Sequence, residues 1–589
     1  MKTIVEILSG RVSEAMEKVT GEADCQALVR QSQDARFGDY QSNGVMGLAK
    51  RLKTNPRELA GKIVAELDVS DMCEEPEVAG PGFINFTLKN EFIGGRLAGM
   101  DKDAAGRLGI DSTEEAKKVV VDFSAPNIAK QMHVGHLRST IIGDCICRLM
   151  EFRGHEVVRQ NHIGDWGTQF GMLIAYLKDE NPEVIDKPET VEIADLEQFY
   201  KNAKKRCDED PAFEAKARSE VVKLHNHAED TLTVWKHIVD ESRKHYQPIY
   251  DMLGVDLDES NERGESFYAD RLAGVVEELK TRGVAIESEG AVCVFPEGFK
   301  NKEGDPLPFI VQKSDGAFLY ATTDMAALQY RLRELGADKV IYVTDGRQQL
   351  HFKMLFASAR MADWVSEDAE LMHVWFGTML GEDGKPFKTR SGKTIKLRDL
   401  LSEAVERARG VVEEKNPGLN DEQKDQVARA VGIGAVKYAD FSNNRTTDYV
   451  FSFDRMLSMD GNTAPYMQYA YARVKSIERK AEEKGVDIAA EVERLGALNV
   501  SEPAEVELGK HIMRYGEAIA SASADCRPNF LTSYLYDLAQ KFSSFYSACP
   551  VLGADEDKRA TRLVLCDLTA NVIRHGLSEL LGIDVVEQM

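Results

Sequence analysis

One stretch of this sequence constrains the fold more than any other: residues 119–139, which read VVVDFSAPNIAKQMHVGHLRS. The β-branched run at its start is typical of a buried parallel strand. The proline in the turn that follows biases Ala125 toward an extended backbone. Helical spacing begins near Ile128, and it predicts that His133 and His136, three residues apart, project from one helix face. The segment therefore predicts a strand, a tight turn and a helix that carries two imidazoles.

Such an arrangement suits a nucleotide. Gly135, between the two histidines, lets a flat base approach the backbone, and imidazoles can donate hydrogen bonds to phosphate oxygens as charge builds. An H-x-x-H pair on its own is more often structural, and it could also bind a metal. The preceding strand and turn, together with a basic segment further along, favour the nucleotide interpretation.

That basic segment, residues 381–397, reads GEDGKPFKTRSGKTIKL. Its central cations are Lys385, Lys388, Arg390 and Lys393. They predict a Gly-rich loop that could fold over phosphates and neutralise developing charge. An isolated basic loop is solvated surface about as often as a site, and its pairing with the histidines favours function. A P-loop is rejected, because Phe387 occupies the position of the required first glycine.

A possible substrate site follows from other residues. The predicted strand over residues 339–343 ends shortly before Gln348, at the carboxyl edge of a parallel sheet, where ligands bind. Tyr320 and Asp324 lie four residues apart and would face one way on a helix. A carboxylate and further acceptors suit a planar guanidinium. Taken alone, these residues favour a simpler interpretation, in which Asp324 caps a helix and Asp122 is a strand-end acid.

Length and composition limit the number of domains and the classes of protein to which this chain could belong. The 589-residue chain is too long for one core and predicts two to four domains. Its net charge of −24 argues against a protein that coats itself in nucleic acid, but a locally basic RNA-binding groove remains possible. Nine scattered cysteines without a C-x-x-C pair predict no zinc site, no disulfide framework and a reducing cytoplasm. No apolar run approaches a membrane span, and the polar N-terminus predicts an amphipathic helix rather than a signal peptide.

The order of these patterns predicts a multidomain α/β protein, whose Rossmann-type parallel sheet is interrupted by an insertion. We expect a small α+β N-terminal domain over 1–112, a Rossmann-type domain over 113–378 with an insertion at about 186–312, a basic-loop and connecting helical region over 379–458, and an all-α bundle over 459–589. Residues 283–312 alternate like a small antiparallel sheet.

These blocks resemble those of class I aminoacyl-tRNA synthetases. Residues 133–136, His-Val-Gly-His, stand where that class has H-I-G-H. The flanking residues 124–130 and 137–140 resemble arginyl-tRNA synthetases in particular. Residues 387–393 are similar to the arginyl variant of the K-M-S-K-S motif, with Arg390 where the second lysine is expected. The resemblance covers essentially the whole chain. It implies that the N-terminal α+β domain over 1–112 binds tRNA, that the Rossmann-type domain over 113–378 is catalytic, and that the helical bundle over 459–589 binds the anticodon.

The resemblance implies an arginine–tRNA ligase that forms arginyl-adenylate from arginine and ATP, and then transfers the arginyl group to the terminal ribose of tRNA(Arg). It implies Mg²⁺ with the ATP, a requirement for tRNA even in adenylate formation, and a cytoplasmic monomer without an obligate protein partner.

The implied catalytic residues are His133, His136, Lys388 and Lys130. The implied ATP contacts are Pro126, Asn127, Ala129, Gly135, both histidines, Lys385, Arg390 and Lys393. The implied arginine contacts are Asp122, Asn127, Tyr320, Asp324 and Gln348. We expect tRNA contacts at Tyr40, Asn43, Tyr466, Gln468 and Tyr469, because aromatic faces can carry unstacked bases.

Two alternatives stay open. The first is a class I synthetase or related ligase for a different amino acid. The second is a non-catalytic tRNA-binding or regulatory paralogue, against which the intact His133, His136 and Lys388 argue. A Rossmann oxidoreductase is disfavoured, because the glycine fingerprint of that class is missing.

Overall fold

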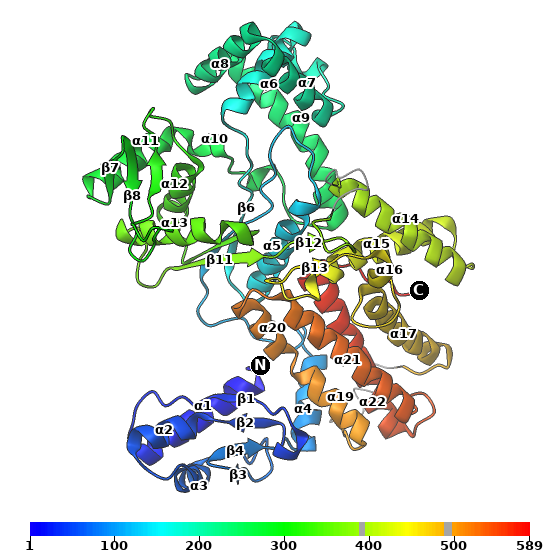
Figure 1. Cartoon of the computed structure of the whole chain (residues 1–589). Coiled ribbons are helices and arrows are strands. Elements are labelled where there is room, and N and C mark those ends of the chain that lie inside the picture. Colours follow the sequence, from blue (N-terminus) through cyan, green and yellow to red (C-terminus); the bar gives the residue numbers. More distant parts are fainter. Residues whose placement is uncertain (388–394, 488–489, 491–497) are drawn as a thin grey trace. The chain divides into compact units, whose positions relative to one another are not determined.

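The computed structural model describes residues 1–387, 395–487, 490 and 498–589 (Figure 1). It divides into two compact units. Unit 1 consists of Met1–Ser112, Met459–Glu579 and Val585–Met589, and unit 2 of Thr113–Ser458 and Leu580–Asp584.

The centre of unit 2 is a four-stranded parallel sheet with the order β11-β10-β5-β6. Its strands are β5 (Lys118–Asp122), β6 (Glu156–Gln160), β10 (Lys339–Asp345) and β11 (Glu370–Phe376). The chain leaves β5 toward β6 on one side and reaches β10 on the other, so the winding reverses between β5 and β10. Ligands bind at the carboxyl ends of the strands beside such a reversal. The predicted Rossmann-type sheet is confirmed.

Helices and a second sheet surround these strands. Helix α5 (Val134–Phe152) joins β5 to β6 and packs on β5, β6 and β10. The segment between β6 and β10 contains α6 (Thr168–Glu180), α7 (Leu196–Glu209), α8 (Pro211–His225), α9 (Glu229–Leu253), α10 (Glu265–Tyr268), α11 (Leu272–Thr281), β7 (Ala285–Ser288), β8 (Ala291–Val294), β9 (Phe309–Gln312) and α12 (Tyr320–Arg333). Strands β7, β8 and β9 pair antiparallel, as the alternation in residues 283–312 predicts.

The remaining elements of unit 2 follow β10. They are α13 (Gln349–Met361), β12 (Met379–Leu380), α14 (Leu397–Lys415), α15 (Asp421–Phe441), β13 (Tyr449–Val450) and α16 (Phe453–Met456). Five short 3₁₀ turns complete the unit: η2 (Pro182–Ile185), η3 (Pro188–Thr190), η4 (Glu259–Asn261), η5 (Ala269–Arg271) and η6 (Gly346–Gln348).

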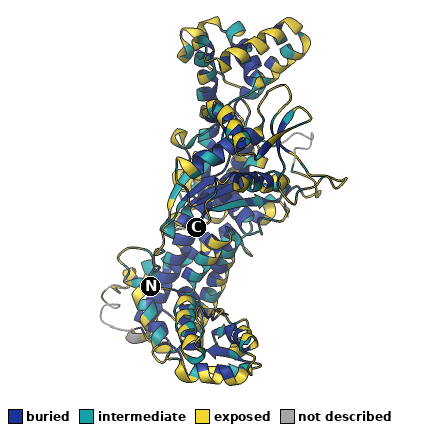
Figure 2. Cartoon of the chain, turned by 90° about the vertical axis from the view of Figure 1, so that its left-hand side faces the viewer, coloured by how far each residue is buried: buried dark blue, intermediate teal, exposed yellow. Residues whose placement is uncertain are grey.

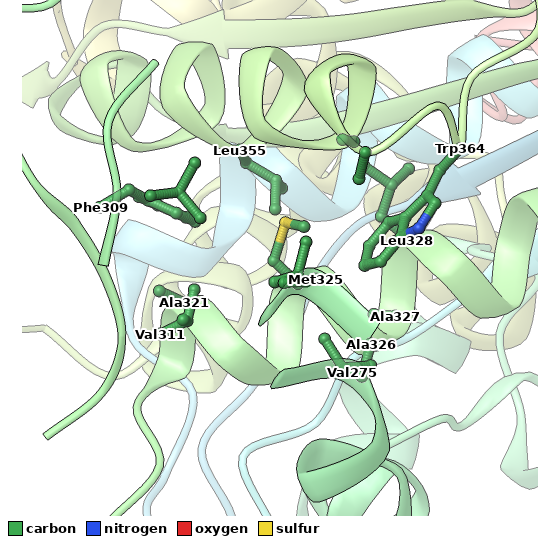
Figure 3. Packing of buried hydrophobic residues seen from close by; sticks show 14 of the residues in the cluster. Val275, Phe309, Val311, Ala321, Met325, Ala326, Ala327, Leu328, Leu355 and Trp364 are labelled. Atoms are coloured by element: carbon green, nitrogen blue, oxygen red, sulfur yellow. The ribbon is translucent and has the colours of Figure 1, made fainter. Parts of the chain in front are cut away.

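One core of unit 2 lies between α11, α12, α13 and β9 (Figure 3). Met325 and Leu328 on α12 and Leu355 on α13 are fully buried there, beside Trp364. Because close-packed apolar side chains leave little freedom to shift, this core fixes α12 against α13.

Unit 1 combines a small sheet with helices. The sheet is antiparallel, with the order β1-β2-β4-β3. The described elements of unit 1 are α1 (Ile4–Thr20), β1 (Val29–Gln31), η1 (Ala35–Phe37), β2 (Tyr40–Ser42), α2 (Gly44–Leu52), α3 (Pro56–Glu66), β3 (Glu77–Ala79), β4 (Phe83–Phe86), α4 (Asn90–Asp101), α17 (Ala464–Glu483), α19 (Pro503–Met513), α20 (Tyr515–Ala524), α21 (Pro528–Ala548), α22 (Glu556–Arg574) and the π-helical η7 (His575–Leu580). Buried residues run along strands and inner helix faces, and exposed residues lie on the outer faces (Figure 2).

Candidate active site

The turn after β5 is held in a rare backbone conformation. Ser124, Ala125 and Ala129 have φ of +73°, +48° and +60°, a region that side chains disfavour. The extended conformation predicted for Ala125 is therefore wrong. Tertiary hydrogen bonds outweigh the local preference: the Ala125 N–H donates to Asn161 Oδ1 at 3.0 Å, and the Ser124 N–H donates to Ser139 Oγ at 2.9 Å. Strain held in this way is common at ligand sites.

The two histidines cap helix α5. The helix begins at Val134 and not near Ile128, so His133 is its N-cap and only His136 lies within it. The Gly135 N–H donates to His133 Nδ1 at 3.0 Å, and the His133 N–H donates to His136 Nδ1 at 3.1 Å. These reciprocal bonds form a capping box, which satisfies backbone donors at the helix start.

This cap decides which imidazole nitrogens carry hydrogen. Each Nδ1 accepts a hydrogen bond from a backbone N–H, so in a neutral ring the proton resides on Nε2. Burial lowers the pKa of His133. Burial, and then the neighbouring His133, lower the pKa of His136 to about 3. Both rings, with centroids 4.1 Å apart, are therefore neutral Nε2–H donors at neutral pH.

Gly135 is required by the same cap. A Cβ at this position would lie 2.7 Å from His133 Cε1 and 2.9 Å from His133 Nδ1. Any side chain would push the imidazole out of its capping position. Glycine at position 135 therefore leaves room for the His133 imidazole as well as for a nucleotide base.

The ends of the basic segment are anchored beside this site. On one side, the Val134 N–H donates to Ile395 O at 3.1 Å and the Leu397 N–H donates to Met132 O at 3.0 Å. On the other, the Phe387 N–H donates to Met379 O at 3.1 Å. Phe387 and Ile395 thus each form a backbone hydrogen bond with another segment of unit 2.

The predicted basic residues fall into two groups. Lys388, Arg390 and Lys393 lie outside the described residues. Lys385 and Lys130 are exposed, and Lys130 Nζ lies 4.8 Å from the centre of the Tyr200 ring.

A buried arginine connects α5 with the segment that leads to β13. Arg138 and Asp440 are 2% and 1% exposed, and Arg138 Nε lies 2.9 Å from Asp440 Oδ2. The same guanidinium donates to Gly377 O at 2.7 Å and to Thr447 O at 3.3 Å. The helix that carries His136 is thereby fixed to the ends of β11 and β13 by charge-assisted bonds.

Asp122 ends β5 and forms an ion pair inside the fold. Arg331, fully buried on α12, donates to Asp122 Oδ2 at 2.9 Å and to Gln160 Oε1 at 2.6 Å. Oδ1 of Asp122 is buried and has no hydrogen-bond partner among the described residues. That oxygen is free to accept a hydrogen bond from a ligand.

The other predicted ligand contacts of this turn differ in exposure. Pro126 and Ala129 are buried, and the Ala129 N–H donates to Ser242 Oγ at 3.1 Å. Asn127 is exposed, and its backbone pairs with Gly164.

The predicted guanidinium residues gather at α12 and α13. Tyr320 and Asp324 lie in the first two turns of α12, which confirms the helix that their spacing suggests. Tyr320 is 67% exposed, and Gln348 is exposed at the start of α13. Asp324 does not cap α12, because the cap residue is Leu319. Oδ2 of Asp324 accepts a hydrogen bond from His351 Nε2 at 2.6 Å.

Glu265 is a functional candidate that the sequence did not reveal. Burial, together with the neighbouring charges of Asp165 and Asp324, raises its pKa to about 7. Asp165, 4% exposed, accepts hydrogen bonds from the Ser266 N–H and hydroxyl at 2.9 and 2.6 Å, which fix the backbone next to Glu265. The acids come from segments far apart in the sequence, with Glu265 on α10 and Asp324 on α12, so no local motif could have brought them together.

The tRNA contacts expected in unit 1 differ in exposure. Tyr40 was expected at the surface but is fully buried, with its hydroxyl donating to Glu517 Oε1 at 2.9 Å. Gln468 is also fully buried. Neither side chain offers a surface on which a base could stack. Tyr469 is 43% exposed, and Tyr466 packs against Tyr536 at 5.5 Å between ring centroids. Asn43 is half-buried.

Two kinds of site are absent from the described part of the chain. There, no group of three or more His, Cys, Asp or Glu side chains could hold a metal ion. Across the same residues, no helix combines the length and apolarity needed to cross a bilayer.

Comparison with known proteins assigns this geometry to a class. The family model described as "tRNA synthetases class I (R), catalytic domain" matches residues 104–453. The DALR anticodon binding domain matches residues 467–589, and the arginyl tRNA synthetase N terminal domain matches residues 6–88. The catalytic region is that of a class I tRNA synthetase.

Individual relatives identify the family to which the chain belongs within this class. The arginine–tRNA ligase of a Picosynechococcus species is 50% identical over 597 residues, covering all of both chains. That of Nostoc punctiforme is 51% identical over 558 residues, 94% of each chain. The crystal structure of arginyl-tRNA synthetase from Plasmodium falciparum matches with a TM-score of 0.84 and 32% identity, again over both whole chains. The chain belongs to the arginyl-tRNA synthetase family.

Proposed function

We propose that this chain is an arginine–tRNA ligase, which activates L-arginine with ATP and transfers it to the 3′-terminal ribose of tRNA(Arg). One observation carries the proposal. Two neutral imidazoles with Nε2–H donors follow strand β5 of the parallel sheet, and the acidic side chains of Glu265 and Asp324 lie on α10 and α12, between strands β6 and β10 of the same sheet. The imidazole donors suit a triphosphate, and the acidic side chains suit a guanidinium.

In the activation step, a carboxylate oxygen of arginine bonds to the α-phosphorus of ATP. The bond from that phosphorus to its bridging oxygen breaks, and pyrophosphate leaves with the electron pair. Negative charge grows on the phosphate oxygens, where preorganised donors stabilise it. Because His133 and His136 are neutral, they donate hydrogen bonds without exchanging a proton.

In the transfer step, a hydroxyl of the terminal tRNA ribose bonds to the arginyl carbonyl carbon. The bond from that carbon to the phosphate oxygen breaks, AMP leaves with the electron pair, and the hydroxyl proton passes to a phosphate oxygen of the AMP or to water. The same two imidazoles lie where the departing phosphate gains charge, so they favour this step as well.

Arginine would be held at both ends. At the guanidinium, Asp324 and Glu265 supply carboxylates, while Tyr320 and Gln348 supply further polar groups. At the other end, the unpartnered Oδ1 of Asp122 would accept a hydrogen bond from the ammonium group, next to Asn127. A planar cation between carboxylates is selected by both charge and fork geometry.

The basic residues would bind the leaving pyrophosphate. We retain Lys130, Lys385, Lys388, Arg390 and Lys393 in that role. Lys130 and Lys385 are exposed, and the two anchored ends of the segment favour it for the others.

Metal ions and quaternary state belong to the same proposal. Mg²⁺ would arrive with the phosphates of ATP, since no acid cluster among the described residues could hold it. We further propose a monomer in the cytoplasm, without structural zinc, with the four domains that the sequence suggests.

Charging of tRNA with each of the twenty labelled amino acids tests the proposal. We expect arginine alone to be transferred. His136→Ala should lower kcat, and Asp324→Ala should chiefly raise the KM for arginine. Charging with glutamate or cysteine instead would indicate a different synthetase. A folded protein that charges nothing would indicate a non-catalytic paralogue.

A further inference from the structure

His351 connects the residues of the proposed arginine site without being one of them. His351 lies in the first turn of α13. It comes three residues after Gln348, which occupies the N-terminal cap position of that helix. Its Nε2 lies 2.6 Å from Asp324 Oδ2, and its ring centroid lies 5.0 Å from that of Tyr320. One imidazole thus contacts both predicted guanidinium residues of α12.

The direction of this hydrogen bond follows from chemistry. An ionised carboxylate only accepts hydrogen bonds, so the His351 Nε2 carries the proton and donates it. The bond occupies Oδ2 of Asp324.

We propose that His351 is a positioning residue for arginine recognition, whose N–H holds one oxygen of Asp324 so that the other faces the guanidinium. This inference rests on the proposed function and adds a residue that does not itself touch arginine. The imidazole acts through Asp324 alone. It removes rotational freedom from the carboxylate before the substrate arrives, which lowers the entropic cost of binding.

The surroundings of His351 suit this role. The side chains of His351 and Asp324 are only 13% and 22% exposed. The rings of Phe309 and Phe352 lie 5.5 and 5.3 Å from the imidazole, the second edge-on. The apolar core in Figure 3 fixes α12, which carries Asp324, against α13, which carries His351, so the distance between the two side chains is set by packing.

Two substitutions separate hydrogen bonding from packing. His351→Phe keeps a ring and removes the donor, whereas His351→Gln keeps an N–H and removes the ring. We expect His351→Phe to raise the KM for arginine by roughly 10- to 100-fold, the effect of losing a hydrogen bond to a charged group. Its kcat and its KM for ATP should stay near wild type. His351→Gln should remain within about 5-fold of wild type, since the donor is restored.

Coupling to Asp324 provides a second readout. In an Asp324→Asn background, His351→Phe should cost little further, because the charged acceptor is already gone. His351→Leu replaces the phenylalanine variant if the latter does not fold. A matched control is His155→Phe, since that imidazole accepts from the Lys117 N–H at the amino end of β6. It should leave the KM for arginine unchanged.

The possible outcomes are distinct. A normal KM for arginine in His351→Phe, or a phenylalanine variant that outperforms the glutamine one, would overturn the inference in favour of simple packing. If His351→Phe raised the KM for arginine as much in the Asp324→Asn background as in the wild type, that result would also overturn the inference. A wild-type protein that does not charge tRNA with arginine would instead refute the proposed function.

Discussion

Replacing Gly135 with alanine should separate activity from stability. The added Cβ would lie 2.7 Å from His133 Cε1, so the imidazole must move and its 3.0 Å bond from the Gly135 N–H is lost. Loss of such a cap costs about 1 kcal/mol. Alanine in place of helical glycine returns about the same amount. The free energy of unfolding should therefore change by less than about 1 kcal/mol, while the displaced donor lowers kcat roughly 100-fold.

The assay compares steady-state tRNA charging with urea unfolding for each variant. Gly274→Ala is the matched control, because this exposed helical glycine lies in the same unit and a Cβ there meets nothing within 4 Å. The control should keep full activity and gain a little stability. A Gly135→Ala enzyme that charges tRNA within about 3-fold of wild type would refute the idea that His133 must keep its capping position to stabilise the reacting phosphate.

Three further predictions follow. Because the pKa of Glu265 is raised to about 7, its carboxylate gains charge as pH rises from 6 to 8, so the KM for arginine should fall over that range and stay flat in Glu265→Gln. The pKa of His136 is about 3, so the imidazole stays neutral between pH 5 and 8. A kcat–pH limb in that range that disappears in His136→Asn would contradict the neutral-donor role. Arg138→Met leaves Asp440 buried and unpaired, and urea unfolding should show a loss of about 3–5 kcal/mol, largely restored by adding Asp440→Leu.

Local patterns were enough to predict the main elements. The β-branched run before Asp122 reads as a buried strand because a parallel strand is covered on both faces. The spacing of Tyr320 and Asp324 likewise predicts the helix on which they lie. Such signals depend on residues that are close together in the sequence, so the sequence alone contains the information needed to recognise them. The chemistry of the histidine pair is also readable, because residue type and spacing largely define it.

Where distant segments compete with local preference, the sequence misleads. Ala125 precedes a proline and should be extended, yet Asn161 accepts its N–H and holds it at positive φ. Helical spacing near Ile128 suggests an early start, but the reciprocal bonds of His133 and His136 begin the helix later.

The sequence by itself determined that this chain has a parallel sheet, a paired-imidazole helix start and candidate acids for a guanidinium. Only the tertiary structure decided that burial and the charges of Asp165 and Asp324 raise the pKa of Glu265, that His351 donates to the Asp324 carboxylate, and that Tyr40 is buried. The physical reason is that burial and the proximity of charges depend on packing between segments far apart in the chain, which no local pattern records.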